Sequence, residues 1–409
     1  MRHSKRVAFV LVTILVLFLC STSFAQYTAI KGIELRDGRT IYGKVLKMNV
    51  DRVIVQDKYG KISTYNFEDV QSLIKGEEVD QSQNQPAKKE PVEQNEKVTT
   101  IKSPIVEAKE TVSIIQEKPW SVEMKVKRYF GSHTSYEFGM PPSPPSWAPA
   151  SRLEFPMNTW WAGGELRRSF SRFSLGAEML AAIPMDSDLS FKDSDWTDPA
   201  NTNVKTIYSE AQCRVEPSYM VRGDVDLKIA DWVGLPVWFD LRPMVGARWQ
   251  RLELEVHNAV QFMAFPPYYY YAPGNVIRFR QTYWQYFIGI KTAYDLGKHI
   301  RVPGLKLLGQ FDWAYVDGDN SDDHLLRGNG GNRMTYEKTR GDAWHASLGF
   351  KAGLTENINA GVEFEYLRIR TEGSHQWVHD VRGINESWDN GVKVWSDQMS
   401  LMMSLEYMF

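Results

Sequence analysis

The chain has 409 residues and a formal net charge of −2, with 48 basic and 50 acidic side chains. This balance argues against a nucleic acid as a partner, because nucleic-acid-binding domains carry a clear excess of Lys and Arg. The 14 tryptophans and 19 tyrosines, in a chain that has no run of about 20 apolar residues after its N-terminal segment, favour either an aromatic-girdled β-barrel or a secreted β-sandwich.

Residues 1–25 have the features of a secretory signal peptide. A basic start is followed by an apolar run that ends at Cys20, and Ser23 and Ala25 are small residues at the positions that define a cleavage site. We therefore predict cleavage after Ala25 and export of the chain. A lipid anchor on Cys20 is disfavoured, because the preceding residue, Leu19, is larger than such a site accepts.

Residues 27–75 predict a small β domain. Short β-rich runs are interrupted by Asp37-Gly38 and Tyr59-Gly60, which are typical of hairpin turns. About five strands of this length indicate an SH3- or Sm-like barrel near the lower size limit for an independent core. Residues 76–118 are rich in Glu, Lys, Gln, Pro and Ser, and this composition predicts a flexible linker.

Residues 120–409 contain long stretches in which apolar and polar residues alternate. In the last stretch, Met403 and Leu405 fall on one face, whereas Ser404 and Glu406 fall on the other. Because the polar faces carry ionisable residues, we expect them to line a barrel interior and the apolar faces to contact lipid. We predict ten antiparallel strands. They lie near residues 121–138, 151–170, 173–185, 215–230, 237–257, 277–296, 305–317, 342–354, 358–372 and 394–409.

Short connections alternate with long ones along these strands. Short turns of outer-membrane barrels belong to the periplasmic side and long loops to the outside. An even number of strands brings both barrel ends to one side, so the N-terminal domain is expected in the periplasm. The terminal Phe409 is similar to the C-terminal signal of chains that the barrel assembly machinery inserts into the Gram-negative outer membrane. The predicted long loops are residues 139–150, 186–214, 258–276, 318–341 and 373–393.

Two acidic motifs fall in the second and fourth long loops. Asp193 and Asp195 belong to the segment "DSDW", and Asp322 and His324 belong to the segment "DDH". Either motif alone is typical of a solvated loop, in which Asp, Asn, Ser and Gly dominate. Together, in two loops of one barrel rim, they resemble the omptins, ten-stranded outer-membrane endoproteases. That family has a D-x-D-W motif in its second long loop and a D-x-H motif in its fourth.

The resemblance implies that a water molecule between Asp193 and His324 attacks the peptide bond, without any cofactor. An imidazole serves as a general base near neutral pH, and Asp322 would hold its second ring nitrogen and stabilise the imidazolium. Asp193 and Asp195 are close carboxylates, so one proton shared between them would face the developing oxyanion. A Ca²⁺ or Zn²⁺ site built from the same four side chains is disfavoured, because the set has one His and no Cys.

The predicted substrate-binding residues depart from the family pattern. Omptins that cleave at basic residues have an acidic residue two positions before the Asp of D-x-H, where this chain has Asn320. Glu137, near the first long loop, is the nearest candidate for a second acidic contact. We expect cationic peptides to be preferred nonetheless, because Asp317 and Asp319 leave the rim acidic.

Omptins also bind lipopolysaccharide on the outer wall of the barrel. Arg248 and Arg251 lie in a similar strand and are candidates for this contact, with lipopolysaccharide as a candidate activator. Snorkelling of the two side chains to the membrane interface explains them equally well.

The sequence therefore predicts an all-β protein with an omptin-like endopeptidase barrel in the cell outer membrane. Its active-site rim would be extracellular, and its substrates would be peptides or proteins. One rival is a non-catalytic barrel, either an adhesin or a degenerate relative of the proteases. A second rival is a small-solute porin, which is disfavoured because barrels of about ten strands fill with side chains. The adhesin interpretation requires that the second and fourth loops do not converge.

Overall fold

A computed structural model describes residues 30–48, 52–59, 61–66, 69–75, 118–140, 147–264, 267–300, 302, 304–327 and 331–409. The predicted signal peptide and almost all of the predicted linker lie outside these residues. The chain divides into two compact units that separate between Glu117 and Lys118. Within the described ranges, no helix has the length and apolarity that crossing a membrane requires.

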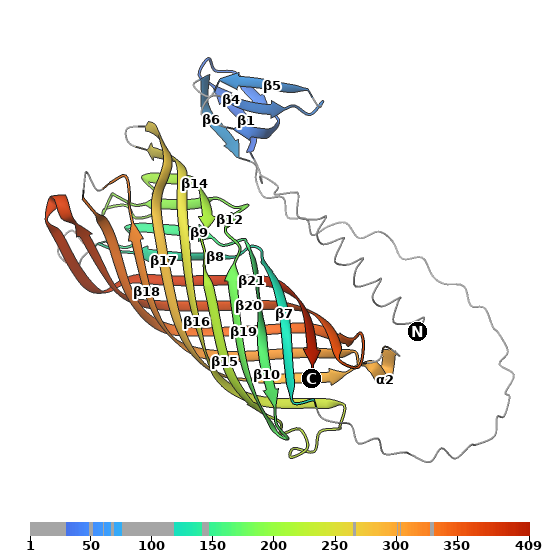
Figure 1. Ribbon diagram of the computed structural model, residues 1–409. Coiled ribbons are helices and arrows are strands. Elements are labelled where there is room, and N and C mark those ends of the chain that lie inside the picture. Colours follow the sequence, from blue (N-terminus) through green and yellow to red (C-terminus); the bar gives the residue numbers. More distant parts are fainter. Residues whose placement is uncertain are drawn as a thin grey trace, which may run out of the picture. The chain divides into compact units, whose positions relative to one another are not determined.

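The described part of the N-terminal unit forms two three-stranded antiparallel sheets (Figure 1). One consists of β1 (Ile30–Leu35), β2 (Thr40–Tyr42) and β6 (Val70–Lys75), and the other of β3 (Lys44–Met48), β4 (Arg52–Gln56) and β5 (Ile62–Asn66). The predicted turn at Asp37-Gly38 joins β1 to β2, and Gly38 adopts the left-handed φ of +85° that glycine accepts without strain. Ile33, Leu35 and Val55 form a small buried core. The SH3-like assignment stays a prediction.

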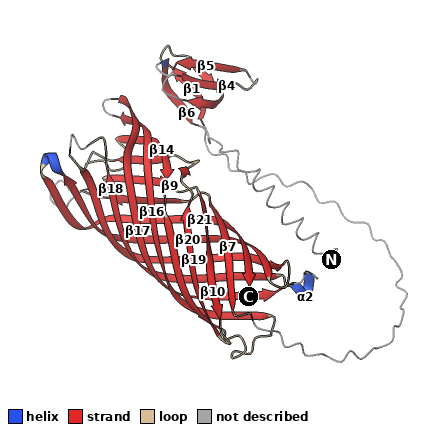
Figure 2. Cartoon of the chain, viewed as in Figure 1, coloured by secondary structure: helices blue, strands red, loops and turns tan. Residues whose placement is uncertain are grey.

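The second unit is a sheet closed on itself, and nearly all of it is strand (Figure 2). Each strand of the ring is antiparallel to the next, and the last one pairs with the first. Over the described residues, the ring runs through β7 (Trp120–Tyr129), β10 (Trp160–Ser169), β11 (Phe173–Ala182), β15 (Tyr219–Leu227), β16 (Phe239–Ala264), β17 (Pro267–Asp295), β18 (Lys306–Asp323), β19 (Arg333–Gly353), β20 (Ile358–His379) and β21 (Ile384–Met408). The predicted all-β barrel is thus confirmed.

At one end of the barrel, four shorter strands take over part of the ring. They are β8 (His133–Phe138), β9 (Ser151–Pro156), β13 (Phe191–Asp195) and β14 (Ile207–Val215), with the two-residue β12 (Met185–Asp186) beside β14. They follow one another between β21 and β16, in the place that β7, β10, β11 and β15 occupy further down. Two short helical turns, α2 (Gly297–Ile300) and η3 (Asp380–Arg382), lie between long strands. The barrel therefore continues well beyond its lower ring.

The outer wall of the lower ring is apolar, as the alternation predicts. On β17, Trp284, Tyr286, Ile288 and Ile290 are exposed, and the neighbouring strands carry similar exposed residues, such as Trp313 on β18. The residues that alternate with them point inward and include charged ones, such as Lys291 on β17 and Asp312 on β18. An apolar belt around a polar interior is the pattern of a barrel whose wall contacts lipid.

The long strands extend past this belt into segments predicted as loops. β17 has 29 residues and β18 has 18, whereas about 9 to 11 residues cross a bilayer. Residues 258–276 and 318–341 were expected as loops but are largely strand. In residues 318–323, Asp, Asn and Gly pair with β17 on one side and β19 on the other, and this pairing outweighs their low strand propensity. Residues 267–275 pair with β16.

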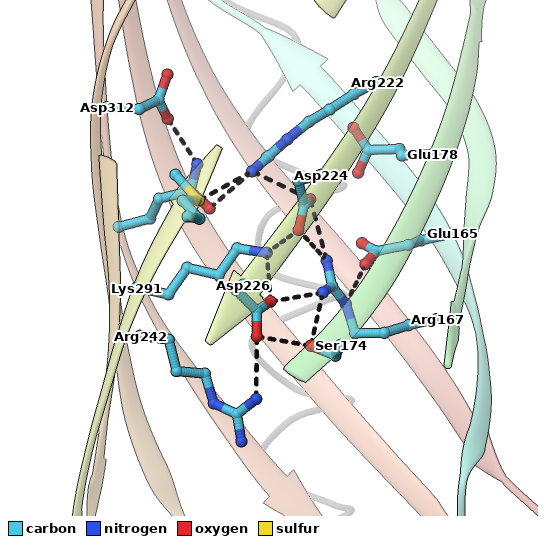
Figure 3. A network of polar contacts seen from close by, with 12 residues as sticks. Glu165, Arg167, Ser174, Glu178, Arg222, Asp224, Asp226, Arg242, Lys291 and Asp312 are labelled. Atoms are coloured by element: carbon cyan, nitrogen blue, oxygen red, sulfur yellow. Dashed lines mark hydrogen bonds and ion pairs between the residues drawn. The ribbon is translucent and has the colours of Figure 1, made fainter. Parts of the chain in front are cut away.

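Ion pairs fill the interior within the belt (Figure 3). Arg167 lies 2.9 Å from Asp224 and 2.7 Å from Asp226, and Lys291 lies 2.6 Å from Asp224. Arg242 adds a contact of 3.0 Å to Asp226. A space of about 20 Å³ among neighbouring side chains holds roughly one water molecule. This packing argues against the porin interpretation.

Candidate active site

Strand β13 positions the first acidic motif. Asp193 and Asp195 lie on β13 and not in a loop, and β13 is held between β9 and β14, with Asp193 opposite Leu153 and Ser209. Residues two apart in a strand point to the same face, and both carboxylates line one cavity. Asp193 is 6% exposed, and its Oδ1 has no hydrogen-bond partner among the described residues. A buried oxygen of this kind is a place for a water molecule or a ligand.

The second motif lies at the end of β18. Asp322 belongs to the strand and is fully buried, and His324 is the first residue after the end of the strand. The Nδ1 atom of His324 lies 3.0 Å from Oδ1 of Asp322, at ion-pair distance but outside ideal hydrogen-bond alignment. The backbone N–H of His324 donates to the carbonyl of Arg333 at 2.9 Å, which ties the residue to β19. The two side chains thus form the expected Asp–His pair.

Sequence reasoning missed Tyr136, which lies on β8. Its hydroxyl donates to Oδ2 of Asp322, the oxygen that does not contact His324. The Tyr136 ring is fully buried and stacks on Phe279, which in turn stacks on Phe155. This aromatic layer holds the hydroxyl in place beneath the carboxylate. The only signal in the sequence was an inward-facing tyrosine in the first predicted strand.

A cavity of about 300 Å³ brings the two motifs together. Asp193 and Asp195 reach it from β13, and His324 reaches it from the end of β18. The convergence that the adhesin interpretation excludes is therefore present. The other residues that line the cavity are Phe138, Met140, Trp147, Ala150, Ser151, Leu153, Trp196, Thr197, Ile207, Arg327, Arg333, Thr335, His375, Trp377 and Trp388.

The electrostatics of the cavity favour a protonated carboxyl group on Asp193. Burial, followed by the neighbouring charge of Asp195, raises the pKa of Asp193 well above the ordinary value for an aspartate. The cations Arg327 and Arg333 act in the opposite direction but do not cancel this shift. Burial and the nearby Arg327 also lower the pKa of Arg333. The carboxyl pair is thus suited to hold one proton.

Within the described residues, no group of three or more His, Cys, Asp or Glu side chains is arranged to hold a metal ion. Of the four motif residues, Asp193, Asp195 and His324 line the cavity, whereas Asp322 contacts His324 and is not part of the lining.

Both residues predicted to bind substrate lie outside the cavity lining, and their role stays a prediction. Glu137 is on the face of β8 opposite Tyr136, where it accepts a hydrogen bond of 2.8 Å from Nε of Arg152. Asn320 points inward but is buried in the ladder next to Glu337. The inward carboxylate at this level is that of Glu337, which lies 2.9 Å from Nδ1 of His375.

The acidic residues that were expected to attract cationic peptides do not face the cavity. Asp317 and Asp319 alternate with the buried residues of β18 and so point to the outer wall of the barrel. Asp317 is 3.2 Å from Arg340, which is itself exposed. These carboxylates therefore do not surround the cavity.

Arg248 and Arg251 were predicted to face the outer wall together, but they lie on opposite sides of β16. They are three positions apart, and a strand alternates every two. Arg248 is inside the barrel, where it donates to Gln285 at 2.8 Å and lies 3.6 Å from Asp312. Its assignment to lipopolysaccharide is therefore wrong. Arg251 does face outward and pairs with Glu253 at 2.6 Å.

No protein-family model matches the chain, and no curated protein matches its sequence. Among solved structures, it is similar to the outer-membrane protease OmpT of Escherichia coli, with a TM-score of 0.61 and 15% identity over 73% of this chain and 99% of that chain. It also matches the translocator domain of the autotransporter NalP of Neisseria meningitidis (TM-score 0.31, 9% identity, 72% and 90% covered). The outer-membrane protein OprG of Pseudomonas aeruginosa gives a TM-score of 0.29 and 8% identity, with 71% and 97% covered. The likeness to OmpT shows that this chain has the fold of an outer-membrane β-barrel.

Proposed function

We propose that the chain is an outer-membrane endopeptidase that acts in the manner of the omptins. The observation that carries the proposal is the shared cavity, in which Asp193 and Asp195 meet His324 from distant segments of the chain. The fold shared with a protease supports it. The ion pairs in the lumen speak for a closed barrel and against a solute channel.

The proposed reaction uses water as the nucleophile. His324 accepts a proton from the water as the oxygen attacks the carbonyl carbon of the peptide bond. Asp322 lies 3.0 Å from Nδ1 of His324 and, with Tyr136 on its other oxygen, orients the ring so that Nε2 is left for the water. The protonated Asp193–Asp195 pair donates to the developing oxyanion. His324 then passes its proton to the leaving amine, and the peptide bond breaks.

The proposed location is the outer membrane, with the cavity on the outside. Trp120, at the start of β7, and Phe409 exchange backbone hydrogen bonds of 3.1 and 2.9 Å, so both barrel ends lie at the same edge, opposite the cavity-bearing strands. An N-terminal domain that enters there would be periplasmic. Arg251 is the remaining candidate for contact with lipopolysaccharide, which we propose as an activator.

Cleavage of a peptide library by the purified full-length protein tests this function. The protein would be assayed in detergent with and without lipopolysaccharide, and products would be identified by mass spectrometry. We expect internal cleavage that His324→Ala abolishes. His299→Asn, at the opposite barrel end where His299 contacts Tyr294, is the matched control and should keep full activity. Absence of cleavage by the wild type, or equal cleavage by His324→Ala, would favour the non-catalytic barrel.

A further inference from the structure

Indole rings dominate the lining of the cavity. Four tryptophans line it, together with apolar side chains such as Met140 and Ile207. Its volume of about 300 Å³ is at the lower end for binding pockets, and it has room for one large side chain. Such a lining favours aromatic and large aliphatic groups, which gain most from leaving water. The four tryptophans are Trp147, Trp196, Trp377 and Trp388.

Two arginines in the same cavity form no ion pair within the described part of the chain. Among the residues that the structure describes, neither Arg327 nor Arg333 has a carboxylate at ion-pair distance. The side chain of Arg327 donates a hydrogen bond of 3.4 Å to Oε1 of Gln261, and the side chain of Arg333 lies over the ring of Trp377. Arginines of the lumen differ: Arg167, for example, contacts two aspartates (Figure 3). A guanidinium group has five donors suited to a carboxylate, and most of these donors stay available here.

Both arginines lie beside the proposed general base. The N–H of Arg327 donates to the carbonyl of His324 at 3.0 Å, and the carbonyl of Arg333 accepts from the N–H of His324 at 2.9 Å. A group bound by these side chains would therefore lie next to the reacting peptide bond. A lysine or arginine of the substrate would meet two like charges at this position.

We propose that the cavity selects peptides with a carboxylate for Arg327 and Arg333 and a large apolar side chain for the tryptophans. The inference rests on the proposed function for its cleavage step, but the binding preference stands without it. It reverses the preference for cationic peptides that the sequence suggested. The carboxylate belongs either to an acidic side chain or to the free C-terminus of the peptide, and both sources present the same group.

The first test measures binding without turnover. Full-length His324→Ala in detergent with lipopolysaccharide would be titrated with matched peptides that carry Phe next to Glu, Gln or Lys, followed by tryptophan fluorescence. The Glu peptide should bind at least about tenfold more tightly than the Gln and Lys peptides, the lower end for charge-assisted hydrogen bonds. Peptides with free and amidated C-termini, with and without Glu, show which carboxylate is bound.

Arginine variants in the same background connect this preference to the cavity. Arg327→Gln and Arg333→Gln should each remove most of the discrimination between Glu and Gln. Arg333→Glu should reverse it toward Lys, which guards against loss of binding through poor folding. Arg340→Gln is the matched control, because Arg340 lies on the same strand but is exposed on the outer wall. An unchanged ratio in the cavity variants would overturn the proposal and leave the arginines only a role in offsetting Asp193 and Asp195.

Hydrolysis by the wild type then separates the two proposals. Selective binding of the Glu peptide without any cleavage would support the binding preference and contradict the protease function. Cleavage of Lys peptides as fast as Glu peptides would contradict the preference and support the protease function.

Discussion

The lumen of the barrel and the cavity above it are built from the same kinds of charged residue but differ in how these are paired. In the lumen, Asp226 contacts Arg167, Arg242 and Lys291 at once (Figure 3). In the cavity, Asp193 has a buried oxygen without a partner, and the nearby arginines have no ion pair within the described residues. Buried charges that are paired contribute to the structure, whereas buried polar groups without a protein partner are places where water or a ligand binds. The contrast separates the structural part of the barrel from its proposed chemical part.

The largest expected effect is the difference in the rate of peptide hydrolysis between a variant that lacks an acid of the cavity region and one that lacks an acid of the lumen. Asp322→Asn removes the charge that stabilises the imidazolium of His324, so we expect peptide hydrolysis to fall by about 10³- to 10⁴-fold, as loss of the acid does in a serine triad. Asp226→Asn, in the lumen, should leave the rate per folded molecule unchanged. The measurement is kcat on one cleavable peptide, and equal losses in both variants would remove the distinction.

The free energy of unfolding, in contrast to the rate, should depend on the acids of the lumen. Asp226→Ala leaves three cations without their carboxylate in a buried site, and breaking such pairs costs about 3 to 5 kcal/mol. Urea unfolding followed by tryptophan fluorescence gives the free energy of unfolding. The control is Asp231→Ala, which breaks the exposed pair with Arg172 and should leave the unfolding midpoint nearly unchanged. Similar losses in both variants would mean that the lumen pairs are not structural.

Asp193→Asn should make the barrel more stable at neutral pH. Because burial and Asp195 raise the pKa of Asp193 in the folded state, the folded chain binds a proton more tightly than the unfolded one, and stability falls as the pH rises. The uncharged variant avoids this loss. We expect a gain of about 1 to 3 kcal/mol at neutral pH and none below the ordinary aspartate pKa of about 3.9. Unfolding curves at acidic and neutral pH check the difference, and a loss at neutral pH would contradict the assignment.

Tyr136→Phe should have the smallest effect. The variant keeps the ring in its aromatic stack and removes only the hydrogen bond to Asp322. We expect hydrolysis to slow by about tenfold, since one hydrogen bond to a charged group is lost. Tyr286→Phe, on the exposed outer wall, is the control. A rate equal to that of the wild type would show that Asp322 needs no support from β8.

Much of the wall was predictable, because alternation runs along most of each long strand and is interrupted only locally, as at the bulge around Asn258. The upper strands were harder, since residues 317–323 are rich in Asp, Asn and Gly and look like a loop by composition. Alternation continues through them nonetheless, and it sends Asp317 and Asp319 outward and Asp322 inward. The same rule separates Arg248 from Arg251, and counting positions would have placed both correctly.

Contacts between distant segments could not be predicted in this way. The hydrogen bond from Tyr136 to Asp322 joins residues 186 positions apart, and nothing in either local pattern indicates it. The two unpaired arginines of the cavity were missed for the same reason. Whether a charged side chain finds a partner depends on the closed ring of strands, which places Arg333 over the ring of Trp377 and, within the described residues, beyond ion-pair distance of a carboxylate.

A double-variant cycle of Asp193 and His324 tests the central claim most directly. If the two side chains act as one unit, His324 as the base for the water and Asp193 as a donor to the developing oxyanion, Asp193→Asn and His324→Asn should each lower kcat by about 10²- to 10⁴-fold. The double variant should then be no slower than the slower single variant, because residues that act as a unit do not lose activity additively. Losses that multiply in the double variant, or a single variant with wild-type kcat, would contradict a shared site across the cavity.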